Sequence, residues 1–399
     1  MMRALDLSST ATGRPARAVA IQHFGSISGG KDSQAVLCKM VERIEHKGLA
    51  AFGNRTPHFL AADTGHENPI TLDHIAYLDD WLRRRVGLRI EMVSANDVPG
   101  LTDEAAFARK RAMLRDEWSK EKRRTRHSGA CNRRRDTWRD GTITKAEWLA
   151  QCDCPVMVSP PVPDHLIESA LELLHPTGIP FLDVAMLHGR FPSTKVRFCT
   201  AETKLIPLMH RERPLLDEGV SVIDWIGERA DESAARTRKK PIQSTRYPSG
   251  ARNVLYRPIF RWPAADAFAI SKRHGLKHNP LYTMGMSRVG CSTCIMVRKR
   301  ELRMWAMRFP AEVERVREWE RLVGLVSRRT AALGTPASLL PAAAVPGDRD
   351  DHGRATIDKA IDWSRTGRDG RTYDLLIELE QRQADEDGLF CDSEYGLCE

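Results

Sequence analysis

The chain has 399 residues, 41% of them hydrophobic, and a formal net charge of +9. This length and composition predict a globular protein with a sizeable core, and the lack of any uncharged apolar run of bilayer length argues against a membrane protein. The excess of basic residues suits a polyanionic partner such as nucleic acid, and it equally suits a nucleotide enzyme with a basic pocket.

The N-terminal segment, residues 1–17, is polar and lacks the apolar stretch of a signal peptide. We therefore expect a flexible N-terminus and a cytoplasmic protein. Its nine cysteines are then expected to be thiols, metal ligands or redox groups rather than structural disulfides.

A glycine-rich loop lies between an apolar run at residues 18–21, which predicts a strand, and a helical pattern at residues 35–44. Its six residues are Ser28, Gly29, Gly30, Lys31, Asp32 and Ser33. A glycine-rich turn at a helix N-terminus gathers unpaired N–H groups and the positive end of the helix dipole around one volume. The glycines permit positive φ angles and close approach, and the lysine adds a positive charge, so the loop predicts a phosphate site.

An ordinary P-loop is the first alternative for this stretch, because residues 25–31 fit the first seven positions of that motif. Asp32, however, stands where a P-loop needs a hydroxyl for Mg²⁺, and it would repel the β- and γ-phosphates. The loop instead resembles that of the PP-loop ATP pyrophosphatase and phosphoadenosine phosphosulfate (PAPS) reductase superfamily, whose fold is adenine nucleotide alpha-hydrolase-like. This resemblance implies a loop that grips an adenine nucleotide, either to break its α–β bond or to hold a sulfonucleotide for reduction.

A second short strand is predicted at residues 57–62, and it ends in Asp63, Thr64 and Gly65. Strand carboxyl ends line the ligand crevice of an open α/β sheet, so Asp63 is expected beside the loop. The tripeptide also resembles the superfamily's second motif, which implies contacts with the nucleotide.

Helical periodicity over residues 70–86 and strand-like alternation over residues 88–93 follow this turn. The order strand, helix, strand, helix, strand predicts an α/β fold with a doubly wound parallel sheet.

The pattern loosens over residues 97–193, where we expect a helical or irregular insertion on the sheet. Basic residues are dense at positions 120–139, and this cluster either tracks a nucleic-acid backbone or forms a solvated helical face. Cys152 and Cys154 are too close in sequence for the usual Cys-x-x-Cys geometry, so we expect them to pack or to be idle.

Cys199 has basic neighbours, among them Lys204, which should favour its thiolate. Its surroundings resemble the PAPS reductase superfamily, in which an Arg and a Cys precede a Lys and a Pro-Leu. Phe198 stands where many reductases have the first cysteine of a pair.

A further strand is predicted at residues 220–227, and a run of charged residues with one serine follows it. The run consists of Arg229, Asp231, Glu232, Ser233 and Arg236. It resembles the superfamily motif that closes over the nucleotide, and its two arginines would converge near the phosphates. Helix capping explains Glu232 and Ser233 almost as well.

A Cys-x-x-Cys pair, Cys291 and Cys294, adds two candidate metal ligands to Cys199. The fourth ligand could come from Cys131, from the Cys152/Cys154 pair or from a non-protein group. The family resemblance implies a 4Fe–4S cluster; zinc and simple packing of the thiols are the alternatives.

The rest of the chain divides by pattern into a helix at residues 297–329, an Ala- and Pro-rich linker at 330–353 and a tail at 354–399, after a nucleotide-binding domain at 18–296. Tyr395 stands where the mobile tail of PAPS reductases has its cysteine. The tail thiols Cys391 and Cys398 are therefore candidates for a shuttle.

These features together predict an enzyme in which Lys31, Asp32, Cys199 and Arg236 are catalytic. Its cofactors are ATP or a PAPS- or APS-like nucleotide, with Mg²⁺ held by Asp32, Asp63 or Asp231. The first hypothesis is a PAPS reductase-like oxidoreductase that works with thioredoxin. The second is ATP-dependent sulfur insertion into nucleic acid, similar to the sulfur-incorporating proteins of DNA phosphorothioation, with a cysteine desulfurase as donor. The third is a nucleotide-binding subunit without turnover.

Overall fold

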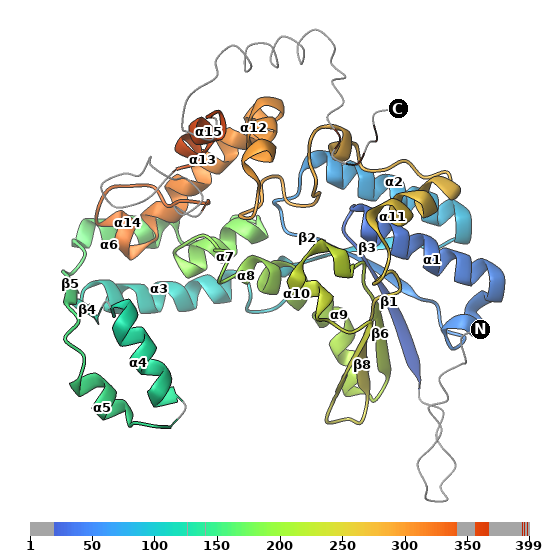
Figure 1. Ribbon diagram of the computed structural model, residues 1–399. Helices are drawn as coiled ribbons and strands as arrows, with labels where there is room; N and C mark the ends of the chain where they lie inside the picture. Colours follow the sequence, from blue (N-terminus) through green and yellow to red (C-terminus); the bar gives the residue numbers. More distant parts are fainter. Residues whose placement is uncertain are drawn as a thin grey trace, which may run out of the picture.

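The computed structural model describes residues 20–125, 127–139, 141–340 and 356–366, together with positions 393, 395 and 397. The expected flexible N-terminus and the thiols of Cys391 and Cys398 lie outside these residues. A sheet flanked by helices forms one half of the described structure, and a helical half lies beside it (Figure 1). None of the described helices is long and apolar enough to cross a bilayer.

The main sheet contains six strands of the described residues in the order β3-β2-β1-β6-β8-β7. These are β1 Ile21–Ile27, β2 His58–Asp63, β3 Ile90–Ser94, β6 Ser221–Trp225, β7 Ile242–Arg246 and β8 Arg252–Tyr256. All neighbouring pairs are parallel except β7 and β8. The first strand was predicted at residues 18–21 but spans Ile21–Ile27. Its polar residues are buried because they find hydrogen-bond partners. Gln22 donates to the Thr56 carbonyl at 2.7 Å, and His23 accepts from the Trp225 indole at 2.9 Å.

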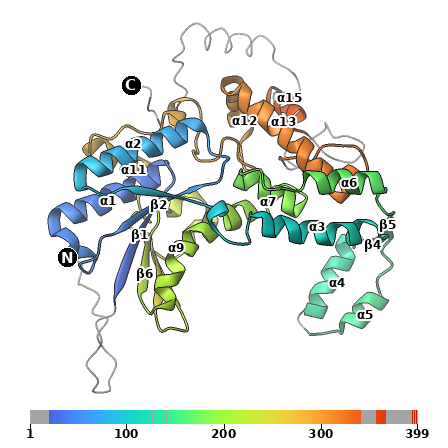
Figure 2. The ribbon, with the colours of Figure 1, turned by 180° about the vertical axis from the view of Figure 1, so that it is seen from behind.

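Helices cover both faces of this sheet, as the doubly wound prediction requires (Figure 2). One face packs against α1 Lys31–Lys47, α2 Pro69–Val86 and α11 Ala264–Arg273, and the other against α9 Ile206–Asp217. Alternate residues of β2 point to opposite faces: Phe59 and Ala61 join the first core, whereas Leu60 and Ala62 join the second. Three short elements flank α9 and β6 along the chain. α8 Phe198–Thr200 and the π-helical turn Ala201–Leu205 precede α9, and α10 Ala234–Thr237 follows β6.

The helical half has its own core, built from the insertion and the C-terminal part of the chain. Its helices are α3 Glu104–Trp118, α6 Asp164–Leu173, α7 Pro180–His188, α12 Lys299–Arg308, α13 Pro310–Leu325, α14 Arg328–Ala331 and α15 Ile357–Ser364. The helices of the insertion therefore share one core with the C-terminal helices, which contribute Trp305 and Trp319.

Two details of the C-terminal part differ from the sequence prediction. The single helix expected at 297–329 breaks between α12 and α13, since Pro310 restricts Phe309, which adopts φ −129° and ψ 60°. Part of the expected linker is packed: Ala337, Leu339 and Leu340 are buried in the helical core. The linker prediction is therefore wrong for this part of the segment, whose apolar side chains belong to the core although Pro and Ala surround them in sequence.

A small unit projects from the helical half, away from the sheet (Figure 1). It contains a two-stranded antiparallel ribbon, β4 Lys122–Thr125 and β5 Val156–Ser159, and two helices, α4 Gly129–Arg139 and α5 Lys145–Ala150. We call residues 122–159 the ribbon module.

Candidate functional site

The glycine-rich loop connects β1 directly to α1 and holds its shape through Ser33. Gly29 adopts φ +69°, and Gly30 is the extended N-cap of the helix. The Ser33 hydroxyl donates to the Gly30 carbonyl at 2.9 Å and accepts from the backbone N–H and the hydroxyl of Ser28 at 3.1 and 3.2 Å. The start of α1 is thereby fixed with its N–H groups toward one volume.

Residues distant in sequence brace this loop from outside. The Asn279 amide donates to the Gly29 carbonyl at 3.1 Å, and the Tyr282 hydroxyl accepts from the Lys31 N–H at 3.0 Å. Gly227, at the end of β6, lies so close that an added Cβ would be 2.6 Å from backbone atoms of Asp32 and Ser33. These three contacts hold the backbone of the loop in place.

The charges of the loop form a chain of ion pairs. The Lys31 ammonium lies 3.3 Å from one carboxylate oxygen of Asp32, and Arg229 contacts the other oxygen at 2.6 Å. Arg229 also binds Asp231 at 2.6 Å and is 3% exposed. This arginine thus orients Asp32, and its charge is already balanced by two carboxylates.

A cavity of about 220 Å³ opens over the loop. Residues that line it opposite the loop are Gly227, Glu232, Arg236, Tyr282, Ser287, Arg288 and Val289. Burial and the nearby Arg288 lower the pKa of Arg236, although Glu228 opposes this effect. Within the described residues Arg288 has no ion-pair partner, so the cavity holds positive charge that a bound anion would balance.

Tyr395 from the C-terminal tail lies against the same lysine. Its ring centroid is 5.0 Å from the Lys31 nitrogen and 5.6 Å from the Tyr282 ring, and its hydroxyl donates to the Ser287 carbonyl at 3.0 Å. The tail therefore reaches the loop with an aromatic side chain at this position, while Cys398 lies outside the described residues.

The other predicted nucleotide residues are not among those that line the cavity. The Asp63 carboxylate accepts from the Gly65 N–H at 2.8 Å, and Thr64 binds Glu67 through its N–H and hydroxyl at 2.9 and 2.6 Å. Ser233 is the N-cap of α10, which agrees with the capping interpretation.

Three thiols gather around Lys204. Its ammonium binds Glu67 at 3.3 Å, and Cys291 forms a β-bridge with Glu67. The negative forms of Cys291 and Cys294 raise the pKa of Lys204, with Cys291 contributing most. Burial raises the pKa of all three thiols, Cys199 included, and outweighs the lowering by Lys204. The expectation that basic neighbours favour the Cys199 thiolate is therefore wrong in this structure.

The iron–sulfur cluster implied by the resemblance has limited support from these residues. They supply three thiols, and the lysine already provides a positive charge beside them. Within the described chain, a different group has its potential metal-ligand atoms all within 4.8 Å of one another. It consists of His127, Cys131, Cys152 and Cys154. The cysteines offered as the fourth ligand thus assemble with each other in the ribbon module. The ligand set Cys199, Cys291 and Cys294 stays a prediction, and no step below uses it.

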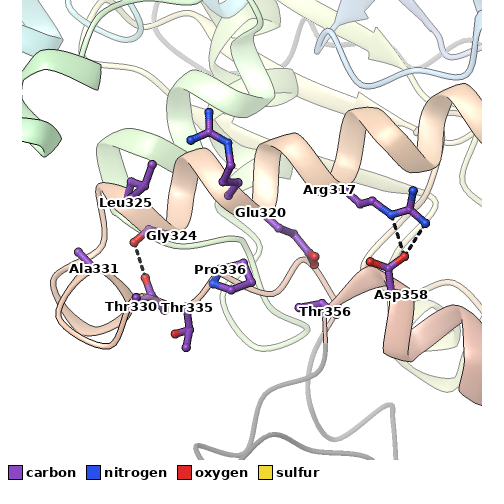
Figure 3. A pocket seen from close by; sticks show the side chains of 12 residues that line it. Arg317, Glu320, Gly324, Leu325, Thr330, Ala331, Thr335, Pro336, Thr356 and Asp358 are labelled. Carbon is purple, nitrogen blue, oxygen red and sulfur yellow. Dashed lines mark hydrogen bonds and ion pairs between the residues drawn. The ribbon is translucent and has the colours of Figure 1, made fainter.

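A second cavity, of about 330 Å³, lies in the helical half and contains none of the predicted site residues (Figure 3). Glu320 of α13 accepts the N–H groups of Leu339 and Ile357 at 2.8 and 2.9 Å, and burial raises the pKa of its carboxyl to about 8. Arg317 binds Asp358 of α15 at 2.6 Å. These contacts fasten the C-terminal segments to α13.

Three residues that contact the loop or line its cavity received no role from the sequence: Asn279, Tyr282 and Arg288. The Asn279-Pro280 pair was visible as a turn signal, since asparagine caps the short helical turn that follows. Nothing in the sequence indicated which loop that turn would contact.

Comparisons with known proteins agree with this fold. The sequence pattern of the phosphoadenosine phosphosulfate reductase domain matches residues 22–297. A protein of Escherichia phage 186, described as an uncharacterized 37.8 kDa protein in gpa 5'region, is 35% identical over 385 residues, which cover 94% of this chain and 96% of that protein.

Two solved structures are distantly similar. The phosphoadenylyl-sulfate (PAPS) reductase of Candida auris, in its phosphate complex, has a TM-score of 0.30 and 14% identity over 68% of this chain and 81% of that chain. The FMN adenylyltransferase of Candida glabrata, in complex with FAD and inorganic pyrophosphate, has the same TM-score and identity over 68% of this chain and 54% of that chain. Neither likeness bears on the site or the reaction. The match over residues 22–297 spans the loop, the parallel sheet and the three thiols near Lys204, and the chain belongs to the phosphoadenosine phosphosulfate reductase family.

Proposed function

We propose that this enzyme binds an adenine nucleotide, ATP or a sulfonucleotide, with its phosphates against the glycine-rich loop, and carries out sulfur transfer or reduction. The observation that carries this proposal is the cavity of about 220 Å³ at the start of α1, which Lys31, Arg236 and Arg288 line together. The same cavity is lined by two carboxylates, Asp32 and Glu232, so its cations exceed its anions by one. This excess of positive charge, together with the helix N-terminal N–H groups, favours a phosphate group over a neutral ligand.

The charged residues would then have separate roles. Lys31 neutralises phosphate charge at the loop, and Arg236 stabilises charge that develops at the reacting group. Asp32 and Asp231 both pair with Arg229 at 2.6 Å, so Mg²⁺ there would displace a guanidinium group. Asp63 is the candidate that keeps a carboxylate oxygen free of hydrogen bonds within the described chain. We also propose that residues 18–296 form the nucleotide-binding domain and 97–193 its insertion.

The products distinguish the two sulfur reactions. In reductive chemistry, a thiolate attacks the sulfur of a sulfonucleotide, the sulfur–oxygen bond breaks, the nucleotide leaves and a second thiol releases sulfite. In adenylating chemistry, an acceptor oxygen attacks the α-phosphorus of ATP and pyrophosphate leaves. A persulfide from the sulfur donor would then displace AMP, and a second thiol would release the thiolated acceptor by forming a disulfide with the donor sulfur. The tyrosine at position 395 supplies no thiol at the loop, so reduction would need Cys199 or a thiol from the tail.

Nucleic acid as the acceptor is the second candidate, because a cleft of about 850 Å³ runs beside the base of the ribbon module. Its basic lining residues include Lys110, Lys122, Arg124, Arg190 and Arg328. Positive charge along a cleft suits a phosphate backbone. This candidate predicts pyrophosphate release from ATP that DNA stimulates and salt suppresses.

The nucleotide proposal is tested by comparing Lys31→Ala with Lys39→Ala, whose side chain lies over Trp262 elsewhere on α1. Loss of a charge-assisted contact of about 1.5–3 kcal/mol should weaken binding of ATP and of PAPS roughly 10- to 100-fold in the first variant. Calorimetric titration measures both affinities, and the Lys39→Ala protein should match the wild type. Equal affinity of the two variants would contradict the loop as the phosphate site.

A further inference from the structure

Four potential metal ligands meet in the ribbon module, far along the chain from the nucleotide cavity. Cys131 Sγ lies 3.2 Å from His127 Nδ1 and 3.4 Å from Cys152 Sγ, and Cys152 Sγ lies 3.2 Å from the same imidazole nitrogen. With the Cys154 sulfur, all four ligand atoms lie within 4.8 Å of one another. We propose that these residues bind one zinc ion, which holds the ribbon module together.

The separations suit a tetrahedral site. Zinc–sulfur bonds of about 2.3 Å place two sulfur ligands roughly 3.8 Å apart. The observed distance of 3.4 Å between the sulfurs of Cys131 and Cys152 is close to this value and far above the ~2.05 Å of a disulfide. Three sulfurs and one imidazole fill all four positions, which makes the site structural rather than catalytic, and soft ligands in this geometry favour zinc over magnesium or calcium.

The local backbone and side chains support the ligands. The Ser128 N–H lies 3.3 Å from the Cys154 sulfur, and the Ser128 hydroxyl accepts from the Cys131 N–H at 3.1 Å. Trp148 donates from its indole to the Cys131 carbonyl at 3.1 Å and packs on the His127 ring at 4.8 Å. Such outer contacts orient metal ligands in proteins.

The module also lacks the apolar core that would hold it together without a metal. Among the side chains that the structure describes here, those of residues 122–125, 127–133, 135, 137–139 and 141–159, the buried ones are Cys131 and Trp148. Both strands of the ribbon are largely exposed. A unit of this size with so little buried surface needs a crosslink or a metal.

The charges of the side chains around the four ligands also favour a bound zinc ion. Exposed Arg133, Arg139 and Lys145 lie on the two helices that carry or flank the ligands. Three thiolates and one Zn²⁺ carry a net charge of −1, which reduces the repulsion among these cations.

Metal analysis of the full-length protein, purified under reducing conditions without chelators, tests the site. The wild type should hold one zinc per chain more than the Cys152→Ser/Cys154→Ser variant. Cys38→Ala, which removes a buried free thiol of α1, and Cys291→Ser/Cys294→Ser should both keep that zinc. Equal zinc contents in the wild type and the Cys152→Ser/Cys154→Ser variant would overturn the proposal.

A second measurement does not depend on how well the variants fold. Wild-type protein stripped with a chelator should take up Co²⁺ and gain the strong visible absorption of a tetrahedral thiolate site, and Zn²⁺ should then displace it. Trypsin should cleave the stripped protein at the Arg and Lys residues of the module and spare the zinc-loaded form. No cobalt spectrum, or a Cys131–Cys152 disulfide in the freshly purified protein, would overturn the proposal.

Discussion

Gly227 sits against the start of α1 with no room for a side chain. An alanine Cβ would lie 2.6 Å from the Asp32 carbonyl carbon and the Ser33 nitrogen, and these backbone atoms cannot rotate away. We therefore expect Gly227→Ala to lower the free energy of unfolding by about 1–3 kcal/mol. It should also weaken nucleotide binding, because relief of the clash moves the loop. Urea unfolding and calorimetric titration measure the two effects.

Gly129→Ala is the matched control for that substitution. Its backbone φ is not positive, and an added Cβ would meet nothing closer than the Arg133 guanidinium at 3.6 Å. Unfolding midpoints that coincide for the two variants would show that the contact at Gly227 is not tight.

The loop residues illustrate what the sequence could indicate at this scale. Ser28 to Ser33 are consecutive, so their chemistry and their strand–turn–helix setting were readable in one stretch. Arg288 and Tyr282 lie about 250 positions away, and only the folded chain brings them to the cavity. The sequence offered Cys131 and the Cys152/Cys154 pair only as a fourth ligand for a distant site. It did not indicate that the fold would bring them together with His127.

At the scale of elements, α9, β6 and β8 meet at a buried pair of carboxyl groups. The Asn253 amide donates to Glu212 at 3.2 Å and to Asp224 at 3.0 Å. Burial, followed by the neighbouring Asp224, raises the pKa of Glu212 above its ordinary value of 4.5. The folded protein consequently holds a proton here that the unfolded chain releases.

This pair predicts a pH-dependent stability. A raised folded-state pKa makes the folded state bind more protons, so the stabilising contribution is complete below the ordinary pKa and declines as pH rises through the folded value. Glu212→Gln keeps a donor for Asp224 and removes the titration. Its melting temperature should therefore exceed that of the wild type at about pH 9 and approach it at about pH 5. A constant difference across thermal scans at several pH values would contradict the shared proton.

The elements themselves were predictable where one signal dominated. α2 begins at the Asn68 cap and Pro69 and matches its predicted range, and β2 is a plain apolar run. The predicted position of β1 was wrong because Gln22 and His23 are polar residues, which the sequence does not show to be buried. The ribbon of β4 and β5 was missed because its mostly exposed strands show no alternation of apolar and polar residues.

For the whole molecule, the nucleotide cavity and the ribbon module are built from different segments of the chain. The loop packs with α1 and α2, whereas the module is attached to the end of α3 through the ribbon. Saturating ATP should slow backbone hydrogen exchange at residues 28–34, 227–236 and 282–289 and leave 122–159 unchanged. Mass spectrometry of peptic fragments measures this. Equal protection of both regions would indicate that the two halves respond to nucleotide as one unit.

The π-helical turn Ala201–Leu205 holds one residue more than an α-helix would need between Cys199 and α9. A chain shortened by one residue here could continue as an uninterrupted helix, so the backbone would absorb the deletion. Each residue turns a helix by about 100°, and the thiol of Cys199 would then turn away from Lys204. Relatives that lack one residue of this turn would keep the same fold but would place a side chain other than that of Cys199 beside Lys204.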